Sequence, residues 1–302
     1  MEASEGVDEQ YRASLRAHFA MLAFSFMIST SFTVGEAITA QLDPVALTFL
    51  RFVLAALIFL AIIIFTGRKI TRPNGSEILR YCWLALLLVL YFVLMFEALR
   101  WTDSLSTGAI FTLAPPMTAL ISWLFLRQHI SLHGMIAMAI AGLGAIWVMF
   151  DGDAEKLARF SIGKGEVIFF LGAVAYAAYS PSVRKLHGNK NLVELTFWTL
   201  IACIILLGAF GWRTILSVDW QAVPLSIYLG IAHLALFTTA MSFYLIQYAS
   251  IYLPSGKVMA YTYLIPAFIV VQKIMLGAPV PSWSVLAGVL VIASAMIILQ
   301  RS

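Results

Sequence analysis

The sequence has few charged side chains and only two cysteines. Charged residues make up 11% of its 302 residues and hydrophobic residues 62%, whereas a soluble domain has about 25% and about 45–50%. Together with a mean hydropathy of +0.93, this excludes an ordinary soluble domain. Cys82 and Cys203 lie far apart inside apolar runs, so neither a disulfide nor a cysteine metal site is predicted.

Motifs for phosphate, metal and covalent chemistry are also missing. The nearest approach to a phosphate-binding loop is "SIGKGE", where Ala158 takes the place of the first glycine and Gly165 that of the required Ser or Thr. The five histidines are scattered and mostly in connectors, and no paired polar side chains of catalytic type lie deep in an apolar run. We therefore expect no ATP-driven pump, enzyme, metal or cofactor, which leaves solute transport.

What the sequence does contain is a series of apolar runs of about 18–23 residues between short polar connectors. That length crosses a bilayer core of about 30 Å as a helix, whereas barrel strands would alternate apolar and polar residues. The sequence predicts an all-α polytopic membrane protein with ten transmembrane helices, near 18–38, 45–66, 78–98, 104–124, 132–150, 166–184, 193–211, 224–245, 253–275 and 282–300.

The basic residues orient these spans. With both termini cytoplasmic, the inner segments hold eleven of the nineteen Lys and Arg residues and the outer loops five, as the positive-inside rule requires. Topology thus explains the net charge of +4, and no nucleic-acid partner is predicted. We expect a cytoplasmic tail over 1–17, too polar for a cleaved signal, and an extracytoplasmic linker over 151–165.

Two sequence matches indicate an internal repeat. "LTF" recurs in spans two and seven at an offset of 148, and "LAPPMTALISWLFL" aligns with "LIPAFIVVQKIML" at an offset of 150, which matches Pro116 with Pro266. Five spans per copy is an odd number, so the copies would enter the membrane from opposite sides. This predicts two inverted five-helix repeats, 18–150 and 166–302, as in many secondary transporters.

The longer stretches that contain this second match, residues 98–149 and 248–299, together with "LTFLRF" in span two, resemble the EamA modules of the drug/metabolite transporter superfamily. Within it they most resemble the YddG-type bacterial amino-acid exporters. The resemblance implies ten helices around a central cavity lined by spans one, three, four, six, eight and nine. The chain departs from many members after spans four and nine, where Arg127-Gln128 and Gly277-Ala278 replace an acidic residue. No role of that acid can therefore be carried over.

Lys257 is the strongest candidate for a substrate-binding charge. A charge deep in a span costs about 2.5–3.5 kcal/mol and usually has a function, although Lys257, near the end of span nine, can also snorkel to the interface. Tyr261 follows four residues later on the same helix face. A cation beside a phenol would attract the carboxylate of an amino acid.

Other ionisable and aromatic residues have a structural interpretation beside a role in transport. Glu36 and Arg51 could pair across the short connector between spans one and two. Lys273 can snorkel from the outer end of span nine. Glu97 either pairs with Arg100 at i,i+3 or borders the mouth of the cavity, and Trp101 either anchors the interface or guards the outer mouth.

Aromatic and hydroxyl residues complete the predicted site. Helical spacing places Tyr176, Tyr179 and Ser180 on one face of span six, and His233, Phe237 and Tyr244 on one face of span eight, with Gln247 at its inner end. A cavity edged by such groups suits zwitterions with apolar side chains.

Prolines and small residues give further expectations. Pro115, Pro116 and Pro266 are expected to kink spans four and nine, which would supply hinges. Spans five and ten are rich in glycine and alanine, so they either pack together within the chain or form a homodimer seam.

The sequence thus predicts a secondary transporter in the bacterial cytoplasmic membrane that exports amino acids, aromatic and other neutral ones among them. The export direction is implied by the resemblance alone. A multidrug or nucleotide-sugar exchanger is the alternative within transport, and an intramembrane enzyme or a passive channel is the alternative outside it.

Overall fold

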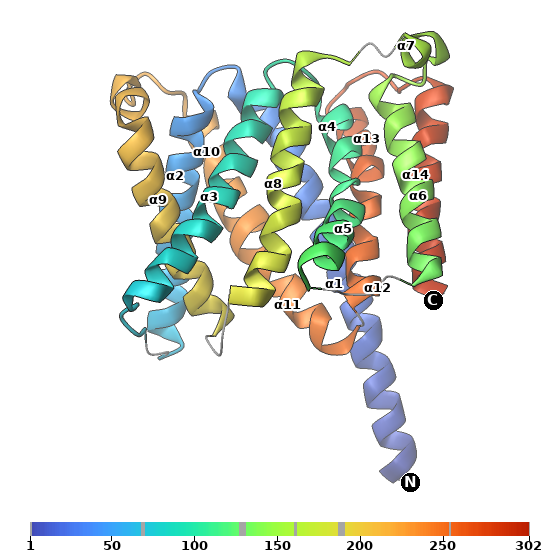
Figure 1. Ribbon diagram of the computed structural model, residues 1–302, viewed down its shortest axis with the longest axis horizontal. Coiled ribbons are helices and arrows are strands. Elements are labelled where there is room, and N and C mark those ends of the chain that lie inside the picture. The colour runs from blue at the N-terminus through green and yellow to red at the C-terminus, as the bar shows by residue number, and fades with distance from the viewer. Residues whose placement is uncertain are drawn as a thin grey trace.

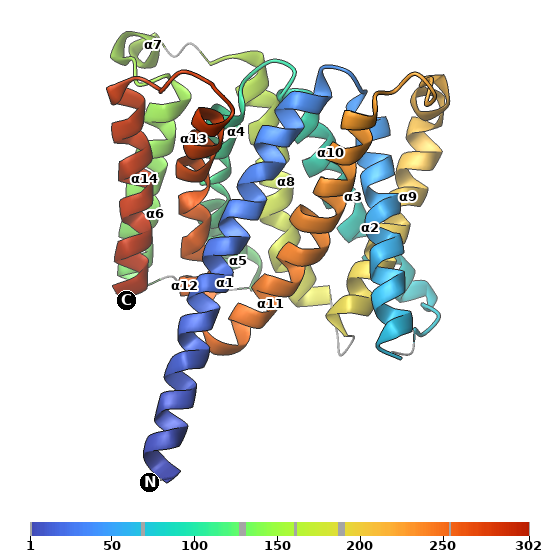
Figure 2. The ribbon, with the colours of Figure 1, turned by 180° about the vertical axis from the view of Figure 1, so that it is seen from behind.

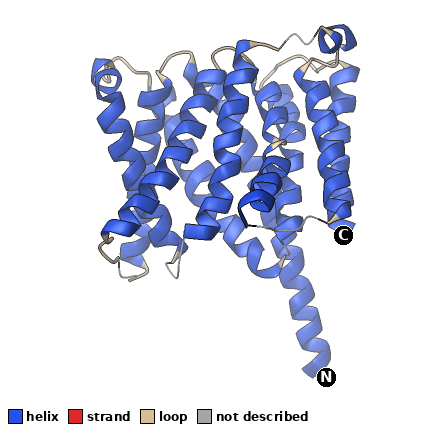
Figure 3. Cartoon of the chain, in the orientation of Figure 1, coloured by secondary structure: helices blue, strands red, loops and turns tan. Residues whose placement is uncertain are grey.

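The computed structural model describes residues 2–67, 70–126, 131–159, 162–186, 191–253 and 255–301, and within these ranges every regular element is a helix (Figures 1 and 3). This confirms the all-helical prediction for the described part of the chain. In the first half the helices are α1 (Glu2–Thr39), α2 (Pro44–Phe65), α3 (Gly75–Ala98), α4 (Ser104–Phe111), α5 (Ala114–Leu126), α6 (Leu132–Met149) and the short α7 (Ala154–Ala158).

The second half contains two segments that are not α-helical. Its elements are α8 (Lys164–Leu186), α9 (Leu192–Ser217), α10 (Leu225–Ala235), the π-helix η1 (Leu236–Met241), α11 (Ser242–Tyr252), α12 (Ser255–Ala260), the 3₁₀ helix η2 (Tyr261–Leu264), α13 (Ile265–Met275) and α14 (Trp283–Arg301).

Nine helical segments among the described residues are long and apolar enough to cross a membrane. They coincide with the first nine predicted spans, while the segment predicted as the tenth, Trp283–Leu299, is a shorter apolar helix. The chain is therefore a multi-pass helical membrane protein.

Local sequence explains where the spans begin. The Asp43 side chain accepts a hydrogen bond from the Val45 amide, and Pro44 occupies the first turn of α2, where its missing N–H costs nothing. Asn74 and Glu77 form a reciprocal capping box at the start of α3. Asp103 caps α4 through the Ser106 amide at 2.7 Å, so capping residues in the connectors set the helix starts.

Predicted spans four and nine are each broken beside their prolines. Span four consists of α4 and α5, separated by Thr112 and Leu113, two residues before Pro115. Span nine consists of α12, η2 and α13, with Pro266 in the first turn of α13. The proline ring has no N–H to donate to the carbonyl one turn earlier and clashes with that carbonyl, so both interruptions precede the prolines by a few residues.

The spans stand side by side, with both marked chain ends at the same end of the bundle (Figures 1 and 2). The opposite end carries α7 and is called the α7 end here (Figure 1). There the Asp153 carboxylate accepts hydrogen bonds from the Lys156 and Glu155 amides, and these bonds lower its pKa.

Helices distant in sequence pack in pairs, α3 with α8, α2 with α9 and α6 with α14.

The pair α6 and α14 corresponds to predicted spans five and ten. A Cβ atom added to Gly144 would lie 2.9 Å from the Gly288 carbonyl oxygen and 3.1 Å from the Ile292 amide nitrogen. Because backbone atoms cannot move aside, only glycine allows this approach. These two glycines therefore serve packing within the chain, one of the two roles that the sequence left open.

Candidate functional site

The buried polar side chains of the bundle gather around α1. Five hydroxyl-bearing residues of this helix are at most 9% exposed: Ser25, Ser29, Ser31, Thr33 and Thr39. They face three different neighbours, because the hydroxyls are spread around the helix. The polar contacts of α1 with its neighbours include two separate cationic sites and one neutral network.

Arg51 of α2 is the centre of the first site. Its side chain is the largest that is fully buried, with 1% of the residue exposed. The guanidinium donates from Nη2 to Thr238 Oγ1 at 2.9 Å and to Thr239 Oγ1 at 3.1 Å, and from Nη1 to Ser31 Oγ at 3.4 Å. We call Arg51, Ser31, Thr238, Thr239 and Phe92 the Arg51 centre.

The π-helix η1 prepares the two threonines as acceptors. The hydroxyls of Thr238 and Thr239 both donate to the Leu234 carbonyl, at 2.8 and 3.1 Å. Their lone pairs are thereby left for Arg51. A π-helical turn inside a longer helix is rare and frequently marks a functional site, and here it brings two adjacent threonines to one guanidinium.

Aromatic rings close the other side of the Arg51 centre. The guanidinium carbon lies 4.1 Å from the centroid of the Phe92 ring, a cation–π arrangement. Next to Phe92, Tyr91 contacts Tyr176 of α8 at a centroid distance of 4.7 Å, and Tyr176 contacts Phe111 of α4 at 5.1 Å. The guanidinium is therefore surrounded by hydroxyls and ring faces.

A neutral network joins α1 to α13. Gln272 is 7% exposed and donates to Ser29 Oγ at 2.6 Å and to the Phe26 carbonyl at 3.3 Å, while its oxygen accepts from Thr33 Oγ1 at 2.8 Å. Each polar atom of the amide thus has a partner, as a buried amide requires.

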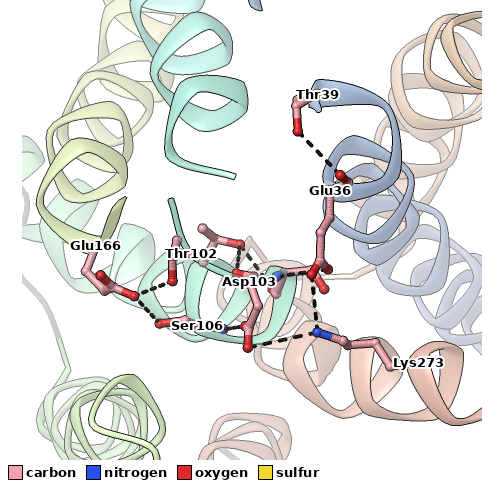
Figure 4. Close-up of polar contacts among 9 residues, drawn as sticks. Glu36, Thr39, Thr102, Asp103, Ser106, Glu166 and Lys273 are labelled. Atoms are coloured by element: carbon pink, nitrogen blue, oxygen red, sulfur yellow. Dashed lines mark hydrogen bonds and ion pairs between the residues drawn. The ribbon is translucent and has the colours of Figure 1, made fainter. Parts of the chain in front are cut away.

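Figure 4 shows the second cationic site, around Lys273. Lys273 shares a groove with Asp151, just before α7, so this site lies at the α7 end. Lys273 Nζ of α13 is 3.5 Å from Glu36 Oε1 of α1 and 3.9 Å from Asp103 Oδ2 at the start of α4. The other Glu36 oxygen accepts from the Ser104 amide at 3.2 Å. We call Glu36, Asp103, Ser104 and Lys273 the Lys273 cluster, and it ties three spans together.

Glu166 of α8 extends this polar layer. Its Oε1 atom accepts hydrogen bonds from Thr102 and, at 3.2 Å, from Ser106 (Figure 4). Asp103, Ser106 and Lys273 also line a groove of ≈ 490 Å³ that continues to Asp151 and Ser282. Charged groups therefore border a hollow at this end of the bundle.

The structure corrects the proposed pairing of Glu36 with Arg51. Glu36 lies in the Lys273 cluster, whereas Arg51 points to the threonines of η1. The connector is short enough for the pair, but Arg51 lies two turns inside α2 and faces the bundle interior. Lys273 is likewise partnered by carboxylates, which the snorkelling interpretation did not foresee.

Lys257 and Tyr261 lie toward the end opposite α7. Lys257 is partly buried in α12. The Tyr261 hydroxyl is 2.7 Å from His18 Nδ1, and the Tyr261 carbonyl accepts from Ser25 Oγ at 2.7 Å. Tyr261 is thus held by α1.

The predicted aromatic faces are only partly assembled. Tyr176 lies near the Arg51 centre through Tyr91, while Tyr179 packs on the cluster of Tyr81, Leu84 and Leu195. The side chains of Ser180 and Gln247 lie outside the described residues.

In span eight, His233 Nε2 is 2.8 Å from Thr30 Oγ1, and its ring contacts Phe237. Tyr244 does not share this face and is 66% exposed. The expectation assumed a continuous α-helix, but the π-helix η1 intervenes, and its wider turn changes the register of every residue that follows.

Glu97 and Trp101 form a surface group. Glu97 pairs with Arg100 at 3.3 Å, which confirms the predicted i,i+3 pair, and accepts from Trp101 Nε1 at 2.9 Å. Lys164 Nζ lies 3.6 Å from the centroid of the Trp101 ring. Both residues are held on the surface near the start of α8.

Sequence reasoning missed Thr238, Thr239 and Gln272. In the sequence they stand out only as two adjacent hydroxyls and one amide inside apolar runs. That pattern does not indicate which side chains they contact. Among the described residues, no group of three or more His, Cys, Asp or Glu side chains is placed to hold a metal ion. The assembled groups can hold charge and hydrogen-bond a solute.

The chain is similar to known proteins in sequence and in fold. A model described as "EamA-like transporter family" matches residues 15–150 and again 163–300. An "Uncharacterized transporter YyaM" of Bacillus subtilis (strain 168) is 24% identical and covers 92% of both chains. An "Uncharacterized transporter" of Archaeoglobus fulgidus is 24% identical over 82% of this chain and 85% of its own.

The fold itself has a solved counterpart. A crystal structure of another protein superposes with a TM-score of 0.70, covering 96% of this chain and 97% of that chain, at 16% sequence identity. At this identity the likeness concerns the fold alone.

Proposed function

Because the chain belongs to the EamA-like transporter family, we propose that it is a secondary transporter that exports amino acids, aromatic and other neutral ones in particular. It would act by alternating access in the bacterial cytoplasmic membrane. Its similarity to proteins named as transporters supports transport rather than catalysis.

The proposed architecture is ten helices in two inverted repeats, 18–150 and 166–302, with 151–165 as an extracytoplasmic linker and both termini cytoplasmic. Two observations support it. The family model matches the chain twice, with a gap over 151–162, and the two marked chain ends lie at the same end of the bundle (Figure 1).

The observation that carries the proposal is the pair of broken spans. The interruption beside Pro115 and Pro116 and the 3₁₀ helix before Pro266 occupy equivalent places in the two halves. Discontinuous helices near the interface of two repeats are where secondary transporters bind solute and bend. These breaks therefore supply both a binding region and hinges.

The polar groups around α1 suit a small zwitterion. Tyr176 and His233 lie near α1 or the Arg51 centre, so we retain both as solute-binding candidates. Lys257 and Tyr261 are retained as candidates at the cytoplasmic end. The cations Arg51, Lys257 and Lys273 lie within the spans. They belong to separate sites, which does not suit a nucleotide sugar, because its phosphates call for several Arg or Lys side chains close together.

The test is uptake into proteoliposomes that contain the purified protein. Labelled threonine, methionine and phenylalanine are offered to vesicles with and without unlabelled amino acid inside, beside protein-free liposomes. A carrier should give saturable uptake that internal substrate accelerates. A channel should saturate weakly and show no counterflow, and an enzyme should convert the label.

Uptake equal to that of protein-free liposomes for all three amino acids, in protein shown to be folded, would overturn amino-acid transport. A panel of cationic drugs and nucleotide sugars would then test the exchanger alternatives in the same vesicles.

A further inference from the structure

Arg51 carries a positive charge that lies inside a membrane span without a counter-ion. Among the residues that the structure describes, no carboxylate lies within ion-pair distance of its guanidinium, and its four hydrogen bonds all go to neutral hydroxyls. A buried cation in a span costs about 2.5–3.5 kcal/mol on insertion scales. Such a charge is usually paired or functional.

Hydroxyls and aromatic rings hold this guanidinium but do not neutralise it. Thr238 and Thr239 accept from Nε and Nη2, while Nη1 has a single contact, 3.4 Å from Ser31 Oγ. One of the two Nη1 N–H bonds therefore has no acceptor among the described residues. The fixed guanidinium keeps donor capacity for an additional anionic oxygen.

We propose that Arg51, held in place by Thr238 and Thr239, binds the carboxylate of the transported solute. The substrate class is then neutral amino acids, aromatic ones included, and organic acids with one carboxylate, since one guanidinium matches one carboxylate in a two-bond geometry. This assignment rests on the proposed transport function. It places the solute's negative group in the interior of the bundle, away from the Lys273 cluster.

The site is closed in this structure, where Arg51 is 1% exposed. A solute reaches the guanidinium only after the surrounding helices separate, as alternating access requires. Ser31 belongs to α1, Arg51 to α2 and the threonines to η1. Elements from both halves of the chain would therefore close around the bound carboxylate.

The first experiment uses the wild-type protein and competition against labelled methionine in counterflow. The competitors are methionine, methioninamide, 3-(methylthio)propylamine, which is methionine without its carboxylate, and 4-(methylthio)butanoate, which is methionine without its amine. We expect methionine and the butanoate to compete and the two compounds without a carboxylate to be roughly 10- to 100-fold weaker, the loss expected for a charge-assisted hydrogen bond. Equal competition by methioninamide would overturn the assignment.

The second experiment compares Arg51→Gln with Arg213→Gln, the same change at an exposed arginine that lies over Trp212. Arg51→Gln should remove the preference for carboxylates over amides, whereas Arg213→Gln should keep it. Arg51→Lys tests the same point with the charge retained and should preserve part of the preference. Arg51→Gln protein that transports methionine with the wild-type preference for carboxylates would contradict the proposal.

The two proposals fail in distinguishable ways. If the wild type carries no amino acid, the transport proposal for amino acids fails, and the carboxylate site is decided by thermal unfolding in detergent. Short aliphatic monocarboxylates should then raise the Tm of the wild type and of Arg213→Gln but not of Arg51→Gln. Equal shifts in all three proteins, or none in the wild type, would overturn the site.

Discussion

Arg51 and Lys273 are both cations within membrane spans, yet their surroundings differ. Lys273 lies at the α7 end with two carboxylates within 4 Å and about a quarter of its side chain exposed. Arg51 lies in the interior with hydroxyls and rings around it and 1% exposure. The first is a partly solvated ion pair, and the second is a buried charge held by neutral groups.

This difference indicates which of the two cations can still bind an anionic solute. A lysine already shared between Glu36 and Asp103 joins helices, because its charge is compensated within the protein. An arginine that is held in place but whose charge has no counter-ion in the described part of the protein can bind the anionic group of a solute. Added salt should weaken the stabilising contribution of Lys273 more than that of Arg51, because interactions of exposed charges are screened and those of buried charges much less so.

The largest effect is expected from removing the acceptors of Arg51. Replacing both threonines, Thr238→Val with Thr239→Val, leaves a buried guanidinium with little to bind. The free energy of unfolding should fall by about 3 kcal/mol, the order found when a buried charge loses its partners. Chemical unfolding in detergent measures it, with Thr196→Val, whose hydroxyl bonds only its own helix, as the control.

Adding Arg51→Met to the double variant extends this test. If the cost comes from the uncompensated charge, the triple variant should recover most of the stability while its preference for carboxylates stays lost. No recovery would mean that the threonines stabilise η1 itself rather than Arg51.

Gln272 gives the intermediate case, a buried polar group without charge beside Lys273. Gln272→Leu removes the partners of Ser29 and Thr33 and should lower the free energy of unfolding by about 1–2 kcal/mol, because two buried hydroxyls lose hydrogen bonds. The same unfolding assay checks it. Ser29→Ala and Thr33→Val in the same chain should reduce the loss, and an undiminished loss would contradict this explanation.

Lys273→Met should cost less, about 1 kcal/mol or below, because the pair is partly exposed and the two carboxylates can be hydrated. The cost should shrink further at high salt. Unfolding curves at low and high salt for the wild type, Lys273→Met and Lys273→Arg measure this. A salt-independent loss above that of Gln272→Leu would show that Lys273 behaves as a buried charge.

The smallest effect is expected at Glu97 and Arg100. Their side chains are 32% and 44% exposed, so Arg100→Gln should change the free energy of unfolding by less than about 0.5 kcal/mol. This variant serves as the lower reference in the salt series. A larger change would mean that Arg100 also holds the Glu97 carboxylate in its hydrogen bond with Trp101.

Local features of this molecule were predictable from sequence. The positions of nine spans agree with apolar length, and the breaks in spans four and nine lie at their prolines. The Glu97–Arg100 pair was also accessible, because helix geometry alone brings residues three apart together. The predicted face of His233 and Tyr244 was wrong because η1 changes the helical register.

The sequence by itself determined that this chain is helical, crosses the membrane repeatedly and has α-helices interrupted beside its prolines, because apolar length and backbone chemistry act locally. Only the tertiary structure decided which charges are compensated. Lys273 meets Glu36 across 237 positions and Arg51 meets Thr239 across 188. Such pairs depend on how helices pack and rotate, which no local pattern records.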